Sequence, residues 1–217
     1  MLSARPRIQA YLSIGLFVVV LVGVSASFYF SAAPEVDYQP RVDVADADTL
    51  SKTQNAAMKG NPQAQYDLGL TYWHADNYKE ALPLIRSAAN AGHADAQYLM
   101  GTAYLEGRGI VQNFRGALEY FSKAADQGHL EAEYRVGIFK RDGLAGSRDR
   151  EAAYVWLNIA AAQGHVDALA SRERLTLAMT GEEIMRAQEA SAQMHEKLSA
   201  KSSQQPKPTT AAQTVAH

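Results

Sequence analysis

Residues 92–129 read "GHADAQYLMGTAYLEGRGIVQNFRGALEYFSKAADQGH" and begin and end with the same Gly-His pair. The pair occurs again at Gly164-His165, and each occurrence follows a run that is rich in alanine. The glycines that open successive copies are Gly60, Gly92, Gly128 and Gly164, at intervals of 32, 36 and 36 residues. A fixed period of this length indicates a stack of repeated helical hairpins.

Each copy contains two segments with helical periodicity, here named helix A and helix B in chain order. In residues 92–129, helix A runs from about Ala94 to Glu106 and ends at Gly107, which suits a left-handed C-cap. Asn113 is the predicted N-cap of helix B, which ends at Gly128. A single hairpin cannot bury its own apolar face, so the repeat predicts a stack of several hairpins.

The pattern A-x-A-Q-Y-x-x-G-x-x-Y-x-x-G-x-G-[IV]-x-Q-N-x-x-x-A-x-x-[YW]-[FL]-x-x-A-A-x-Q-G-H is met almost completely by residues 94–129. It resembles the Sel-one-like repeat (SLR) family of tetratricopeptide-like proteins. This resemblance implies an all-α fold, a short right-handed α-solenoid of antiparallel helix pairs. In this chain the solenoid is expected behind an N-terminal transmembrane helix, which a separate segment of the sequence predicts. The resemblance covers residues 48–199, of which the first part is a half-repeat with Asp48 as a candidate N-cap.

The repeat changes character at its C-terminal end. Glu173 takes the place of Gly69, Gly101 and Gly137 in the earlier copies, so we expect stacking to stop there. A capping helix begins at Thr180, where Thr180 and Glu183 have the spacing of a capping box. Its narrow apolar stripe also leaves open a coiled-coil contact with a partner. Residues 200–217 lack large apolar side chains apart from one valine and are expected to form a disordered tail.

The N-terminal segment predicts membrane attachment. Residues 8–30 contain no charged residue and would span about 35 Å as a helix, enough to cross a bilayer. Arg5 and Arg7 precede this segment, so residues 1–7 are expected in the cytoplasm and the rest of the chain outside it. Residues 31–47 form a linker. The alternative is a signal peptide cleaved after Ala26, which also exports the chain.

Composition excludes several classes of function. The 21 basic and 23 acidic residues give a net charge of −2, which argues against a nucleic-acid partner, and the absence of cysteine excludes a thiolate metal site. Histidines one hairpin apart cannot share a metal ion, because packed helices lie about 8–10 Å apart. We therefore expect His93, His129 and His165 to satisfy backbone groups in turns, with no metal, no cofactor and no catalytic residues.

The candidate binding surface is the concave wall that helix A forms in tetratricopeptide-like stacks. The residues expected to contact a partner are Tyr66, Leu70, Trp73, Tyr98, Thr102, Leu105, Tyr134, Ile138 and Arg141. The three tyrosines are also compatible with packing between layers, whereas Trp73 and Arg141 differ between copies. Aromatic residues and arginine are typical anchors of protein interfaces.

These features favour a non-catalytic scaffold or adaptor that binds a protein partner. The expected location is the bacterial inner membrane, as a single-pass protein with its N-terminus in the cytoplasm and its helical domain in the periplasm. After signal cleavage the protein would instead be periplasmic or secreted. A module that binds peptidoglycan or exported polysaccharide is the alternative, and a hydrolase is a third hypothesis.

Overall fold

The computed structural model describes residues 47–204, and within this range every regular element is an α-helix. The nine helices are α2 (Ala47–Met58), α3 (Pro62–His74), α4 (Tyr78–Asn90), α5 (Ala94–Glu106), α6 (Phe114–Ala125), α7 (Leu130–Asp142), α8 (Arg150–Ala162), α9 (Val166–Thr176) and α10 (Gly181–Gln204). The helix predicted at residues 8–30 and the linker up to residue 46 lie outside the described residues. None of the helices at 47–204 has the length and apolar character needed to cross a membrane.

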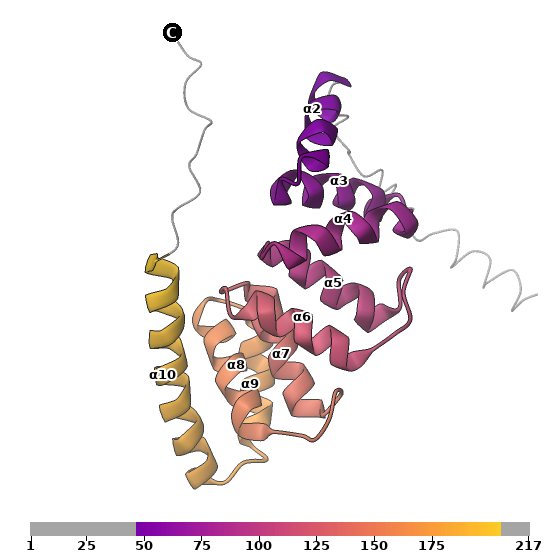
Figure 1. The fold of residues 1–217 in the computed structure, drawn as a ribbon. Helices are drawn as coiled ribbons and strands as arrows, with labels where there is room; N and C mark the ends of the chain where they lie inside the picture. The colour runs from indigo at the N-terminus through magenta and orange to yellow at the C-terminus, as the bar shows by residue number, and fades with distance from the viewer. Residues whose placement is uncertain (1–46, 205–217) are drawn as a thin grey trace, which may run out of the picture. The chain divides into compact units, whose positions relative to one another are not determined.

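The helices form the predicted stack of hairpins (Figure 1). Helices α3, α5 and α7 are the A helices of three copies, and each packs against the B helix that follows it. Each B helix also packs against the A helix of the next copy, so that α4 joins α5 and α6 joins α7. Helix α2 packs against α3, as an N-terminal half-repeat would, but it begins at Ala47, so Asp48 lies in its first turn and is not its N-cap.

Glycine lets the two helices of each hairpin approach closely. A β-carbon on Gly69 would lie 2.7 Å from Ile85 Cγ1, and one on Gly137 would lie 2.7 Å from Leu157 Cγ. At Gly101 the distance to Phe121 Cδ1 would be 2.5 Å. Ile85, Phe121 and Leu157 are completely buried, so a large helix B side chain covers each glycine. The core of the stack is built on this repeated contact.

The connections within hairpins follow the predicted signals. Gly107 ends α5 with φ 73°, and Asn113 Oδ1 accepts hydrogen bonds from the N–H groups of Arg115 and Gly116. The first copy lacks this glycine loop, and Asp76 takes a positive φ of 53° in its shorter turn. The predicted roles of Gly107 and Asn113 are therefore confirmed.

Helix α10 packs against α8, which explains the composition of α8. Four consecutive residues of α8, Tyr154, Val155, Trp156 and Leu157, are all buried. A helix covered on one side only would have an exposed polar face. Met194 and Leu198 of α10 lie against the core that contains Val155 and Trp156, so the apolar stripe of α10 is used within this chain. The same helix continues to Gln204, into the segment that was expected to be a tail.

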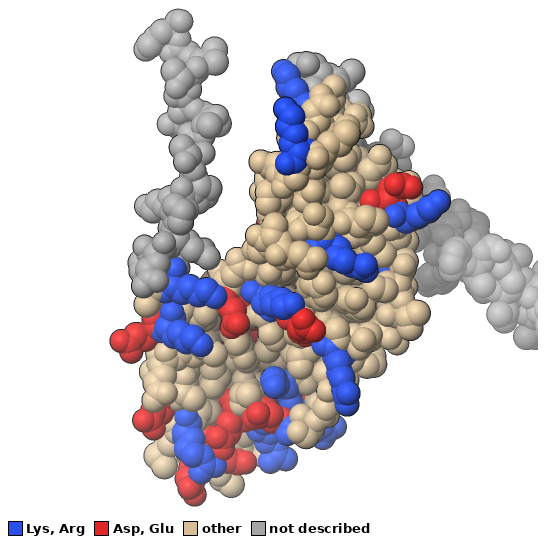
Figure 2. Space-filling view, in the orientation of Figure 1, with Lys and Arg blue, Asp and Glu red and all other residues tan. Residues whose placement is uncertain are grey.

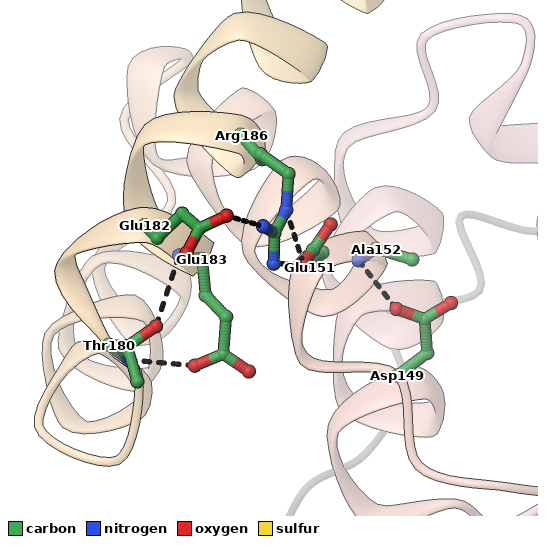
Figure 3. A network of polar contacts seen from close by, with 7 residues as sticks. All are labelled: Asp149, Glu151, Ala152, Thr180, Glu182, Glu183 and Arg186. Atoms are coloured by element: carbon green, nitrogen blue, oxygen red, sulfur yellow. Dashed lines mark hydrogen bonds and ion pairs between the residues drawn. The ribbon is translucent and has the colours of Figure 1, made fainter.

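Polar contacts fix the start of α10 (Figure 3). The Thr180 N–H donates to Glu183 Oε2 at 2.7 Å, and the Glu183 N–H donates to Thr180 Oγ1 at 3.2 Å, which confirms the capping box. Arg186 donates to Glu182 in the same helix and to Glu151 in α8, both at 2.7 Å. These contacts anchor α10 to the beginning of α8.

Candidate functional site

The three repeated histidines are helix N-caps. Nδ1 of His93, His129 and His165 accepts a hydrogen bond from the backbone N–H three residues later, at 3.3, 3.2 and 3.3 Å. In the first copy Asn61 does the same with Oδ1, at 2.9 Å from the Ala64 nitrogen. The predicted role of these histidines, to satisfy backbone groups at the turns, is confirmed.

Each histidine also connects two copies. Because Nδ1 accepts, the ring proton lies on Nε2, which contacts an oxygen in the preceding helix A. The acceptors are Gln63 Oε1 for His93 and Glu131 Oε2 for His165, both at 2.9 Å. For His129 the oxygen is Asp95 Oδ1, which lies 3.3 Å from Nε2 as an ion-pair contact and not as a hydrogen bond. The contacted residue occupies the same position in each copy, so the contact repeats along one side of the stack.

The candidate tyrosines pack against these histidines. The ring centroids lie 4.6 Å apart for Tyr66 and His93, 4.6 Å for Tyr98 and His129, and 4.4 Å for Tyr134 and His165. All three tyrosines are half-buried. Burial, followed by the nearby Asp95 carboxylate, raises the pKa of Tyr66. Packing between layers, the alternative interpretation of the tyrosines, is therefore part of their role.

Five further candidates keep part of their surface exposed: Leu70, Thr102, Leu105, Ile138 and Arg141. Leu70, Thr102 and Ile138 occupy the same position of helix A in three successive copies, and Thr102 Oγ1 donates within its own helix to Tyr98 O at 3.2 Å. Arg141 donates through Nε and Nη2 to the two carboxylate oxygens of Asp142, at 2.7 and 2.8 Å. This pairing holds the pKa of Asp142 below its usual value and raises the pKa of Arg141.

Trp73 is not a surface residue, and its assignment as a partner contact is wrong. The side chain is 6% exposed and belongs to the core beneath α4 and α5. The Tyr78 ring meets it edge to face at 5.0 Å, and the Arg108 guanidinium lies over it at 5.7 Å. The ring is enclosed by α4 and by the loop after α5, neither of which the sequence interpretation took into account.

Glu133 is a buried acid in α7. It occupies the helix A position of Gln65 and Gln97, whose Nε2 groups donate to the carbonyls of Ala57 and Ala89 at 3.2 and 3.0 Å. Glu133 is completely buried, and its Oε2 accepts from Gln163 Nε2 at 2.6 Å, but Oε1 has no partner among the residues at 47–204. The replacement of glutamine by glutamate was visible in the alignment of the copies.

Burial raises the pKa of Glu133 to about 7, and the hydrogen bond from Gln163 offsets only part of this effect. A protonated carboxyl can donate to a carbonyl, as the glutamine amide does in the two earlier copies. A carboxylate at this position has no donor for that contact and leaves a buried charge between two layers. The junction between α6 and α7 is therefore sensitive to pH near neutrality.

A groove of about 630 Å³ lies between α8, α9 and α10 and was not expected from the sequence. Helix α8 contributes Tyr154 and Asn158, α9 contributes Arg172, and α10 contributes Gln188 and His195. The Arg172 Nη1 donates to Asn158 Oδ1 at 2.7 Å.

On the face drawn in Figure 2, basic and acidic side chains lie interspersed over the C-terminal helices. In residues 47–204, no three His, Asp or Glu side chains are arranged to hold a metal ion.

Comparison with known proteins identifies the repeat. The family model described as Sel1 repeat matches residues 62–93, 94–129 and 130–165. A solved Sel1 repeat protein from Oxalobacter formigenes is 30% identical and aligns over 58% of this chain and 97% of its own, with a TM-score of 0.55. This chain belongs to the Sel1-repeat family.

A second solved structure also has the SLR fold. It is a protective antigen present in uropathogenic Escherichia coli strains, 25% identical with a TM-score of 0.64. The alignment covers 74% of this chain but only 36% of the E. coli protein. No curated protein matches the chain. The three Sel1 matches end at the histidine N-caps, and two of the three helices that form the groove, α9 and α10, follow the last match.

The histidine N-caps provide a test of what holds Sel1 layers together. We expect His129→Ala to lower the free energy of unfolding by about 1–2 kcal/mol, through loss of the cap and the ring contact. His129→Asn keeps the cap, as Asn61 does in the first copy, and is expected to cost less than half as much. Urea unfolding of the full chain in detergent micelles can be followed by tryptophan fluorescence. Equal losses in both variants would contradict a capping role.

Glu133→Gln provides a test of the buried acid. Between pH 4.5 and about 7 the folded chain holds a proton on Glu133 that the unfolded chain has released, so its contribution to stability falls as the pH rises. The variant should unfold like the original protein at pH 5 and be more stable at pH 8, by at most about 3 kcal/mol. Urea unfolding at both pH values measures this. The control is Glu119→Gln on the exposed face of α6, which should leave the pH dependence of stability unchanged. If the free energy of unfolding changes with pH in parallel for the original protein and the Glu133→Gln variant, Glu133 is not the group responsible.

Proposed function

We propose that this Sel1-repeat protein is a non-catalytic interaction scaffold of the bacterial cell envelope, anchored in the inner membrane by residues 8–30. One observation carries the proposal. Partly exposed helix A residues at equivalent positions of three copies form a strip along the stack, consisting of Leu70, Thr102 and Ile138 with Leu105 and Arg141 beside it. A rigid repeated surface of this kind suits an extended protein partner.

The strip is rigid because the residues beneath it are fixed between layers. Tyr98 is held by His129, and His129 is held by the α7 N-terminus and by Asp95. A partner that binds the strip therefore meets side chains that lose little conformational freedom, which favours affinity. Each tyrosine ring has one face covered by a histidine, so at most one face of each ring is left to stack on a sugar, which counts against the glycan-binding alternative.

The N-terminal sequence supports the membrane part of the proposal. Residues 8–30 are uncharged, two arginines precede them, and the helical domain follows after a linker. By the positive-inside rule, this arrangement favours a periplasmic location for the domain. The scaffold would then present its strip at the membrane surface to an envelope protein.

Thr102→Arg tests the strip. A long charged side chain at the centre of a complementary interface should reduce partner capture by about 10-fold or more, because it clashes and is desolvated. The measurement is quantitative affinity capture after crosslinking in intact membranes. Thr71→Arg is the matched control, because Thr71 is exposed on α3 and makes the same hydrogen bond to the carbonyl four residues earlier. Equal capture by the two variants would exclude the strip as the binding surface.

The anchor is tested by fractionation and N-terminal sequencing. We expect the full chain to stay in the membrane pellet after alkaline carbonate extraction, and a variant lacking residues 8–30 to lose this association. A mature protein that begins after Ala26 would establish the signal-peptide alternative. Protease added outside intact spheroplasts should digest the domain, and protection from it would contradict the proposed topology.

A further inference from the structure

The groove exists because α10 departs from the path of the other B helices. Helices α4, α6 and α8 each pack closely against the A helix of their own copy, whereas α10 makes its main contact with α8 and has little contact with α9. Glu173 stands where Gly69, Gly101 and Gly137 receive a large side chain, so a B helix cannot approach α9 in the same way. Helices α9 and α10 are left as two walls, with α8 between them.

Arg172 brings an unusual charge into this groove. It occupies the position of Met100, which is completely buried in the second copy. Arg172 is half-buried, and the one hydrogen-bond partner of its guanidinium among residues 47–204 is the neutral Asn158 Oδ1 at 2.7 Å. The half-buried Arg135 and Arg141 differ, because each is paired with a carboxylate of its own helix, at 3.1 and 2.7 Å.

Asn158 orients the guanidinium without neutralising it. A guanidinium has five N–H donors in a planar fork that matches a carboxylate, and the single hydrogen bond to Asn158 leaves the others for a ligand. Gln188 and His195 line the opposite wall from α10 and can add further donors. Ala162, Ile184 and Ala192 line the same groove and supply its accessible apolar surface. The volume of about 630 Å³ is sufficient for several side chains.

We propose that the groove between α8, α9 and α10 binds an apolar segment of a partner protein that places an acidic side chain against Arg172. The segment's apolar residues cover Ala162, Ile184 and Ala192, and its carboxylate completes the ion pair that Arg172 lacks. This site is separate from the helix A strip, so the scaffold holds two segments, which can belong to one partner or to two.

Glu173 adds selectivity at the edge of the groove. Its side chain is exposed and has no hydrogen-bond partner among the described residues, although it lines the same groove as Arg172. A segment with several acidic residues is repelled by it, whereas one with a basic residue next to the acid matches both charges. Removal of this carboxylate should therefore increase the affinity for a purely acidic segment.

The test uses two soluble peptides, acetylated and amidated at their ends, with the sequences Ala-Leu-Glu-Ala-Leu and Ala-Leu-Gln-Ala-Leu. The chain has no cysteine, so a single cysteine in place of the exposed Ser51 allows one fluorophore to be attached to the full chain in detergent micelles. Microscale thermophoresis then gives the Kd of each peptide. We expect the glutamate peptide to bind roughly 10-fold more tightly than the glutamine peptide, because a hydrogen bond to a charged partner adds this much.

Three substitutions make the result specific. Arg172→Met installs the residue that the second copy carries and should reduce the ratio of the two Kd values to about 1. Arg135→Met removes a half-buried arginine outside the groove and should leave the ratio unchanged. Glu173→Gln should tighten binding of the glutamate peptide about two- to threefold. Thermal unfolding by circular dichroism checks that the variants fold.

The proposal is overturned if neither peptide binds at millimolar concentration, if the two bind equally, or if the ratio survives in Arg172→Met. Thr102→Arg in the helix A strip should not change the peptide ratio. If Thr102→Arg loses partner capture but keeps the ratio of the two Kd values, the strip is tested without the groove. If Arg172→Met loses the ratio but keeps partner capture, the groove is tested without the strip. The two proposals can therefore fail separately.

Discussion

Each layer of the stack depends on one contact, in which a glycine of helix A lies beneath a large side chain of helix B. At Gly137 a β-carbon would meet Leu157 Cγ at 2.7 Å and its backbone nitrogen at 3.2 Å, so neither the side chain nor the helix axis has room to move. Overpacking at such a point costs about 1–3 kcal/mol. The junction between one copy and the next, from helix B to the following helix A, is instead a turn of a few residues in which the histidine N-caps act.

The same constraint accounts for the end of the stack. Where Glu173 replaces glycine, the following helix cannot lie in the usual place, and it packs on α8 instead. Trp156 and Ile159 lie on the outer side of α8, and they are only 8% and 2% exposed because α10 covers this side. One substitution in helix A and an apolar outer face in helix B therefore act together to end the repeat and to open a groove beside α9.

The period of the repeat, its helices and its caps could be predicted because they depend on local signals. Gly107, Asn113 and the Thr180–Glu183 pair act within a few residues of themselves, and the histidines repeat at a fixed interval. Trp73 was misplaced because its burial depends on Arg108 and Tyr78, which reach it only in the folded stack. The groove was missed for the same kind of reason, since the path of α10 depends on which helix offers it an apolar face.

Differences between copies locate the functional residues better than the shared residues do. The tyrosine–histidine contacts are repeated in all three copies and are needed by every layer, so they carry no information about a partner. Leu70, Thr102 and Ile138 occupy one position that varies between copies; Leu70 and Ile138 pack in part against the core, but all three keep exposed surface that a partner can contact. By the same argument, Arg172 and Glu133 are informative. They stand at the positions of Met100, which is completely buried, and Gln97, which donates a hydrogen bond to the Ala89 carbonyl. Each substitution places a charge or a titratable group at a position where packing does not require one. Such a substitution is expected where binding or a response to pH, rather than stability, determines the residue.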